Sequence, residues 1–123
     1  MADEQWIRNE AVAALSDPGM VVHEVADPRL VAKAVEQIQP GVVIVDLQIG
    51  SMGGMAVART IREAEFLEEI PPTSIVLLLD RTADEFLAGR AAADAWVIKP
   101  FTPQQLRSAI ANATASLAGG RSE

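Results

Sequence analysis

Three charged residues each come directly after a run of apolar residues: Asp46 after residues 42–45, Asp80 after 74–79 and Lys99 after 95–98. Two carboxylates and one ammonium, brought together, would form a small polar cluster. Such a cluster could hold a hard cation through oxygen ligands, and the same cation would neutralise a phosphoryl group. Each residue taken alone is more often a solvated loop residue, but the three together favour the cluster.

The elements that would bring these residues together follow from hydrophobic periodicity and turn signals. Amphipathic spacing predicts helices over residues 4–16, 26–39, 54–69, 82–93 and 102–117, and β-rich or continuous apolar runs predict strands over 20–25, 40–46, 74–80 and 95–98. Strands that alternate with helices indicate a doubly wound α/β fold with a parallel sheet covered on both faces. Because the carboxyl ends of parallel strands share one edge, the three charged side chains are expected at that edge.

Two helix starts carry the spacing of a capping box, in which a hydroxyl residue and an acid or amide three residues later exchange hydrogen bonds with the backbone. These pairs are Thr82 with Glu85 and Thr102 with Gln105. We therefore expect both helices to begin at these threonines.

Composition excludes several classes. The chain has 123 residues, half of them hydrophobic, which suits a single domain. A net charge of −7 without a basic patch argues against direct nucleic-acid binding, and the lack of cysteine excludes disulfides and thiolate metal sites. No apolar run approaches the ~20 residues of a membrane span, and "MADEQ" lacks the features of a secretory signal. These features predict a cytoplasmic protein without membrane contact.

A longer pattern resembles a known family. "VVIVDLQIGSMGG" at 42–54, "KPF" beginning 53 residues after Asp46, and a helix that opens "TPQQL" are similar to the receiver domain of two-component response regulators, over residues 2–117. The resemblance implies a flavodoxin-like three-layer sandwich with five parallel strands and five helices. It also implies a signalling module, not an enzyme, which accepts a phosphoryl group on an aspartate with Mg²⁺ bound. We assign residues 1–117 to this domain and 118–123 to a flexible tail.

The resemblance assigns the reacting groups residue by residue. Asp46 matches the phosphoacceptor, whose carboxylate attacks phosphorus in line while a metal offsets the charge of the anion. Asp46 would also bind Mg²⁺, together with Asp3 and the backbone carbonyl of Gln48. Lys99 matches the lysine that pairs first with the acceptor and then with the phosphoryl oxygens.

Further positions follow from the same resemblance. Pro100 matches a proline that the family holds in a cis peptide bond after the lysine, and Gly54 matches the glycine that closes the loop after the acceptor. Trp96 stands where the family has an aromatic residue whose rotamer reports phosphorylation. An aromatic side chain that simply packs at the edge of the sheet is an equally good interpretation of Trp96.

The sequence departs from the family pattern in three places. No apolar strand precedes the first helix, so the usual first strand is missing and Ala2 replaces one of two acids beside Asp3. Asp80 stands at the switch position, where the family has Thr or Ser. An ionised aspartate accepts but cannot donate a hydrogen bond, and it would repel a phosphoryl group unless a cation lies between them. Only Arg81 separates Asp80 from the next helix, a shorter link than the family's.

These features predict an atypical single-domain receiver, with a weaker resemblance to a divergent actinobacterial-type branch. Its partners would be a sensor histidine kinase and a downstream protein, which would bind the face made by residues 82–93, 95–98 and 102–117; a homodimer is left open. A degenerate scaffold that works without phosphorylation is the alternative, because Ala2 and Asp80 depart from the family pattern. A flavin or nucleotide binder is disfavoured, because an acid precedes "GSMGG" and no P-loop lysine follows.

Overall fold

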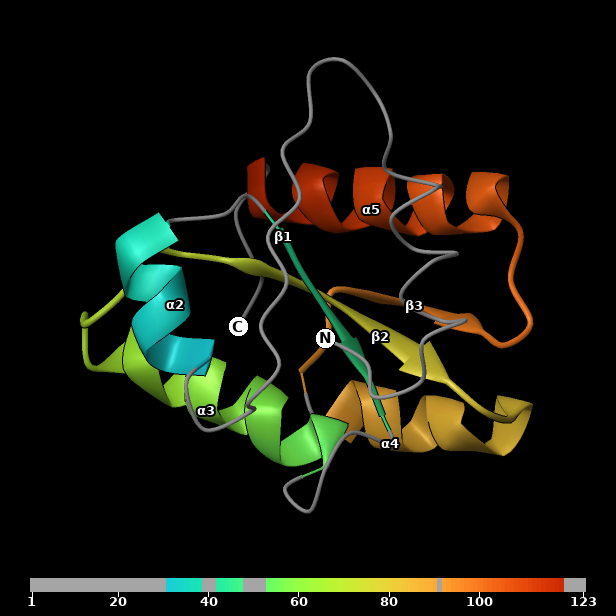
Figure 1. Ribbon diagram of the computed structural model, residues 1–123, viewed down its shortest axis with the longest axis horizontal. Helices are drawn as coiled ribbons and strands as arrows, with labels where there is room; N and C mark the ends of the chain where they lie inside the picture. Colours follow the sequence, from blue (N-terminus) through green and yellow to red (C-terminus); the bar gives the residue numbers. More distant parts are fainter. Residues whose placement is uncertain (1–30, 39–41, 48–52, 91, 119–123) are drawn as a thin grey trace.

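The computed structural model describes residues 31–38, 42–47, 53–90 and 92–118. Their elements, in chain order, are α2 (Val31–Ile38), β1 (Val42–Asp46), α3 (Gly54–Phe66), β2 (Ser74–Leu79), the 3-10 helix η2 (Thr82–Asp84), α4 (Glu85–Arg90), β3 (Ala95–Ile98) and α5 (Pro103–Ala118) (Figure 1). The predictions for the first helix, the strand at 20–25, the missing first strand and the tail after residue 118 lie outside the described residues.

The described strands form a parallel sheet in the order β1-β2-β3, as the alternation of strands and helices predicted. Asp46 pairs in register with Leu78, and Leu79 pairs with Ile98, so the strands end level with one another. All six residues of β2 are buried. β2 pairs with β1 on one side and β3 on the other, so it is the central strand of the described sheet. Its continuous apolar run suits a strand whose two faces are both covered.

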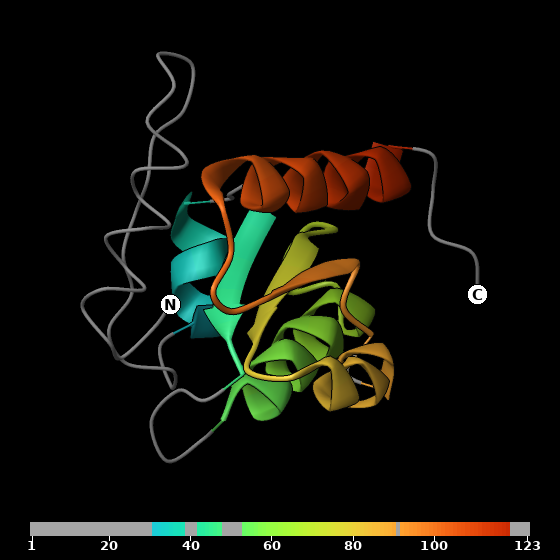
Figure 2. The same cartoon turned by 90° about the vertical axis from the view of Figure 1, so that its right-hand side faces the viewer.

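Two hydrophobic clusters lie on opposite faces of the sheet and give three layers (Figure 2). The alternation of β2 divides its side chains between them: Ile75, Leu77 and Leu79 on one face, Val76 and Leu78 on the other. The first cluster is completed from α2, α3 and α4 by Val35, Val57, Ala58, Ile61, Ala64 and Ala88. The second is completed from α5 by Leu106, Ala109, Ile110 and Ala113. This is the α/β flavodoxin-like arrangement that the sequence predicted.

Two helices are shorter than predicted, and both end before a residue in the left-handed region. Helix α3 ends at Phe66, and Glu68 has φ 59°; the N–H of Glu69 then donates to the carbonyl of Ala64. The segment 82–93 is η2 followed by α4, which ends at Arg90, and Ala92 has φ 58°. Glycine normally occupies such positions, so non-glycine residues gave no stop signal.

One predicted capping box is wrong and the other is confirmed. Arg81, not Thr82, precedes the 3-10 helix, and its backbone N–H donates to Asp84 Oδ2 at 3.1 Å, so Glu85 is left to another partner. At α5 the Thr102 N–H donates to Gln105 Oε1 at 2.8 Å and the Gln105 N–H to Thr102 Oγ1 at 3.1 Å.

An arginine of α3 fixes the edge of the sheet at which β2 and β3 begin. Arg62 donates to Asp94 Oδ2 at 2.7 Å and to the carbonyl of Ala92 at 2.9 Å. The same Asp94 oxygen accepts the N–H of Ile75 at 2.7 Å. These contacts tie α3 to the starts of β2 and β3.

Nowhere in the described segments is there a helix with the length and apolarity needed to cross a bilayer.

Candidate functional site

Backbone hydrogen bonds beyond the strand ends place the three charged residues at one edge of the sheet. The N–H of Leu47 donates to the carbonyl of Leu78 at 2.9 Å, which continues β1 past Asp46. The N–H of Lys99 donates to the carbonyl of Leu79 at 2.7 Å, which continues β3. The sheet therefore extends to the site itself and holds the backbone of Asp46 and Lys99 rigidly.

Asp46 and Lys99 form a buried ion pair. The Lys99 Nζ atom lies 2.9 Å from Asp46 Oδ1 and 3.0 Å from Asp46 Oδ2. The Asp46 side chain is 1% exposed and that of Lys99 is 7% exposed. A buried carboxylate is tolerated when it is paired, and here one ammonium contacts both of its oxygens.

Asp80 joins this pair from the end of β2. Its Oδ1 atom lies 2.8 Å from Lys99 Nζ, and its side chain is 40% exposed. The ammonium therefore stands between the two carboxylates, and the predicted polar cluster forms. Burial lowers the pKa of Lys99, but the hydrogen bonds to Asp80 and Asp46 and their negative charges outweigh it and raise the pKa above its ordinary value of 10.5.

Gly54 closes the loop that follows Asp46. Its N–H donates to the carbonyl of Leu47 at 2.8 Å. A Cβ atom at this position would lie 2.5 Å from the Asp46 carbonyl oxygen and 2.7 Å from the Leu47 Cα. No side chain fits there, so the first turn of α3 can approach the end of β1 only with glycine at position 54.

The peptide bond between Lys99 and Pro100 is cis, the geometry that the sequence resemblance implied. Phe101 follows as a buried residue of the cluster beneath α5. The chain thus turns from β3 into α5 immediately after the lysine.

The model of the response regulator receiver domain family matches residues 1–111. The chain belongs to this family. Receiver domains are the signalling modules of response regulators in two-component systems, where they act with sensor histidine kinases.

Similar proteins are found in Guillardia theta and in Vibrio cholerae. The "Probable transcriptional regulator ycf27" of Guillardia theta is 30% identical over 108 residues, which are 88% of this chain and 41% of that protein. The chain thus spans less than half the length of that curated relative. The chemotaxis protein CheY4 of Vibrio cholerae is 24% identical, with a TM-score of 0.77 over 91% of this chain and 92% of that chain, and shares the fold.

A third neighbour bears on the metal. The receiver domain of sensor histidine kinase PA1611 from Pseudomonas aeruginosa PAO1 is 20% identical, with a TM-score of 0.77 over 94% of each chain, and holds a magnesium ion in its active site cleft. In the present protein, Asp3 and Gln48 lie outside the described residues. The described part contains no group of three or more Asp, Glu, His or Cys side chains able to enclose a metal. Asp46 contributes carboxylate oxygens at the strand end, and these are the donors that Mg²⁺ prefers.

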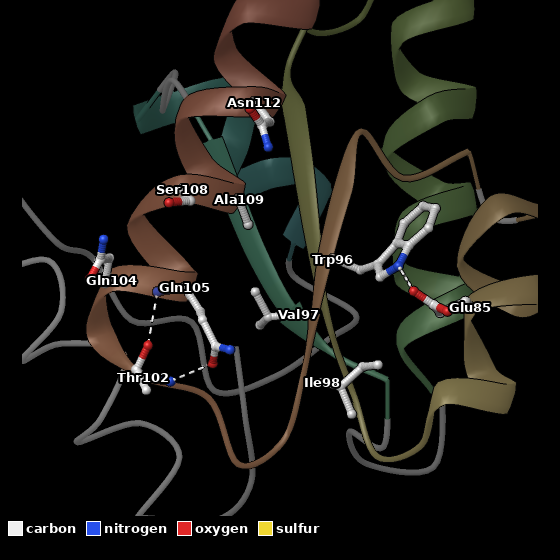
Figure 3. Close-up of a pocket in the computed structure, with 10 residues that line it drawn as sticks. All are labelled: Glu85, Trp96, Val97, Ile98, Thr102, Gln104, Gln105, Ser108, Ala109 and Asn112. Atoms are coloured by element: carbon white, nitrogen blue, oxygen red, sulfur yellow. Dashed lines mark hydrogen bonds between the residues drawn. The ribbon is translucent and has the colours of Figure 1, made fainter.

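A side-chain hydrogen bond joins Trp96 to α4. Its indole N–H donates to Glu85 Oε2 at 2.8 Å, and its ring packs against the cluster on the α3 face (Figure 3). Sequence reasoning missed Glu85 as a functional candidate because the spacing to Thr82 assigned it to a capping box.

A groove of about 520 Å³ lies along β3 between Glu85 of α4 and the polar side of α5. Figure 3 shows Trp96 and Val97 pointing to opposite sides of β3, with residues of α5 beyond Val97. The α5 residues that line it include Gln104, Gln105, Ser108 and Asn112. The groove lies on the face that the sequence predicted as a partner surface.

Proposed function

We propose that this receiver domain accepts a phosphoryl group on Asp46 from a sensor histidine kinase and signals by contact with another protein. The observation that carries the proposal is the Asp46 carboxylate at the end of β1, 1% exposed, with Lys99 Nζ within 3.0 Å of both oxygens. A carboxylate nucleophile and a fixed cation are what phosphoryl transfer requires of a protein.

In the transfer, one Asp46 oxygen forms a bond to phosphorus as the bond from phosphorus to the donor breaks in line, and the electron pair leaves with the donor group. Lys99 keeps its proton and turns its ammonium from the carboxylate to the phosphoryl oxygens. Asp46, Asp3 and the backbone carbonyl of Gln48 would hold Mg²⁺, which supplies positive charge against the approaching anion.

The proposed partner surface is the face formed by α4, β3 and α5. On this face Ala88, Ala109 and Ala113 belong to the core, whereas Ala83, Ala111 and Ala115 are exposed. The groove offers further contact groups, with half-buried Trp96 and exposed Glu85 on one side and polar α5 residues on the other. A downstream protein or a second copy of the chain would bind there, without nucleic acid or membrane.

The extent and setting of the module are part of the proposal. Residues 1–117 would form the receiver and 118–123 a tail; the family match over 1–111 supports the first range, and α5 includes Ala118. We propose a cytoplasmic signalling module rather than an enzyme.

Incubation with acetyl phosphate and Mg²⁺, followed by intact-mass measurement, tests the transfer. The native chain should gain the mass of one phosphoryl group, and Asp46→Asn should gain none. Glu69→Gln, which changes an exposed acid away from the site, is the control and should match the native chain. Labelling that persists in Asp46→Asn would contradict the proposal.

The alternative of a scaffold that works without phosphorylation has one observation in its favour. Asp80 Oδ1 already pairs with Lys99 Nζ at 2.8 Å, so this ammonium has a second anionic partner without a phosphoryl group. Such a scaffold would gain no mass in the same experiment.

A further inference from the structure

We propose that Asp80 competes with the incoming phosphoryl group for Lys99 and thereby limits how readily Asp46 is phosphorylated. The inference rests on the proposed function, since it concerns the same transfer. It starts from the contact between Asp80 Oδ1 and Lys99 Nζ at 2.8 Å, at the position where the family resemblance implies a neutral hydroxyl.

Three carboxylate oxygens lie within hydrogen-bond distance of Lys99 Nζ. An ammonium has three N–H donors, and Lys99 Nζ contacts Asp46 Oδ1, Asp46 Oδ2 and Asp80 Oδ1, at 2.9, 3.0 and 2.8 Å. Lys99 is also 7% exposed, so solvent offers little alternative. A phosphoryl oxygen can therefore bind this ammonium only by displacing one of the carboxylate oxygens.

The exposed fractions show which carboxylate yields. Asp46 is 1% exposed and carries the new group, whereas Asp80 is 40% exposed. Asp80 can turn into water and recover hydration for its charge, while Asp46 cannot. As Lys99 turns from Asp46 to the phosphoryl oxygens, Asp80 is therefore the carboxylate that can leave the ammonium for water.

Charge acts in the same direction as the competition for donors. A phosphoryl group on Asp46 brings negative charge to the ammonium that Asp80 already neutralises, so the two anions repel once they share it. A threonine or asparagine at position 80 lacks this charge and can donate to a phosphoryl oxygen. The native aspartate thus disfavours the phosphorylated state relative to either neutral residue.

The test compares initial rates of labelling at Asp46 by acetyl phosphate with Mg²⁺, read by intact mass. Asp80→Asn, which keeps the size of the side chain, and Asp80→Thr should be labelled about three- to tenfold faster than the native chain. Asp80→Glu keeps the charge and should be labelled more slowly than Asp80→Asn and Asp80→Thr. Glu69→Gln removes one charge at an exposed position away from the site and should leave the rate unchanged.

The outcomes separate this inference from the function on which it rests. Labelling of the native chain and of Asp80→Asn at equal rates, or slower labelling of Asp80→Asn, would overturn the inference and leave the phosphoacceptor role standing. Labelling confined to the neutral variants would support the inference and refute phosphorylation of the native chain. Labelling of none of the folded variants would overturn both. Thermal unfolding of each variant establishes that it is folded.

Discussion

The indole N–H of Trp96 donates to Glu85 Oε2 at 2.8 Å, and this bond joins the edge strand β3 to the first turn of α4. Asp80 directly follows β2, and five residues later Glu85 begins α4, so the contact lies close along the chain to the charged site.

Glu85→Ala should release the indole. In a Trp6→Phe background, where Trp96 is the sole tryptophan, we expect stronger acrylamide quenching of its fluorescence and a loss of about 1 kcal/mol in stability, because a hydrogen bond to a charged group is removed. Glu85→Gln retains a carbonyl acceptor and should behave like the native residue. Equal quenching in the alanine and native chains would show that the bond does not hold the ring.

Lys99→Met should destabilise the fold by about 3 kcal/mol near neutral pH, because Asp46 loses the ammonium that contacts both of its buried oxygens. Lys33→Met removes an exposed lysine from α2 and is the matched control, with an expected change below about 0.5 kcal/mol. Urea unfolding followed by circular dichroism measures both. A similar small effect of the two substitutions would contradict a structural role for the pair.

The same lysine predicts a dependence on alkaline pH. Its pKa is raised above 10.5 in the folded chain, since the bonds to Asp80 and Asp46 outweigh burial. The stabilisation it contributes is therefore complete below about pH 10.5 and is lost as the pH rises through the folded pKa. The stability difference between the native chain and Lys99→Met should shrink across that range. A difference that stays constant would refute the assignment.

Gly54→Ala should destabilise the chain by about 2 kcal/mol and slow the labelling of Asp46, because its Cβ atom would lie 2.5 Å from the Asp46 carbonyl oxygen. Gly89→Ala is the matched control: nothing lies within 4 Å of the added carbon, and the site is inside α4. It should stabilise by about 0.5–1 kcal/mol. Thermal unfolding of both variants measures the two changes in stability. A change of the same sign in both would contradict the close approach at Gly54.

The sequence predicted the parts of the fold that depend on local pattern. The buried run before Asp80 is the central strand, and the Thr102 and Gln105 pair caps α5, because hydrophobic period and capping chemistry act within a few residues. The charged cluster was also predictable, since the ends of parallel strands must meet at one edge.

What the sequence could not reveal depends on tertiary contacts. The spacing of the sequence paired Glu85 with Thr82 in a capping box. The position of β3 beside α4 pairs it with Trp96 instead. The ends of α3 and α4 precede Glu68 and Ala92, which adopt a conformation that local rules assign to glycine. The shared use of Lys99 by Asp46 and Asp80 likewise requires side-chain positions that follow from packing.

The most direct test of Asp46 as the phosphoacceptor is to locate the phosphoryl group. After reaction with acetyl phosphate and Mg²⁺, borohydride reduces an acyl phosphate on aspartate to homoserine, and peptide mass spectrometry finds the converted residue. We expect homoserine at position 46 and nowhere else, with no conversion in Asp46→Asn. Conversion at Asp80 or another acid, with Asp46 intact, would contradict it.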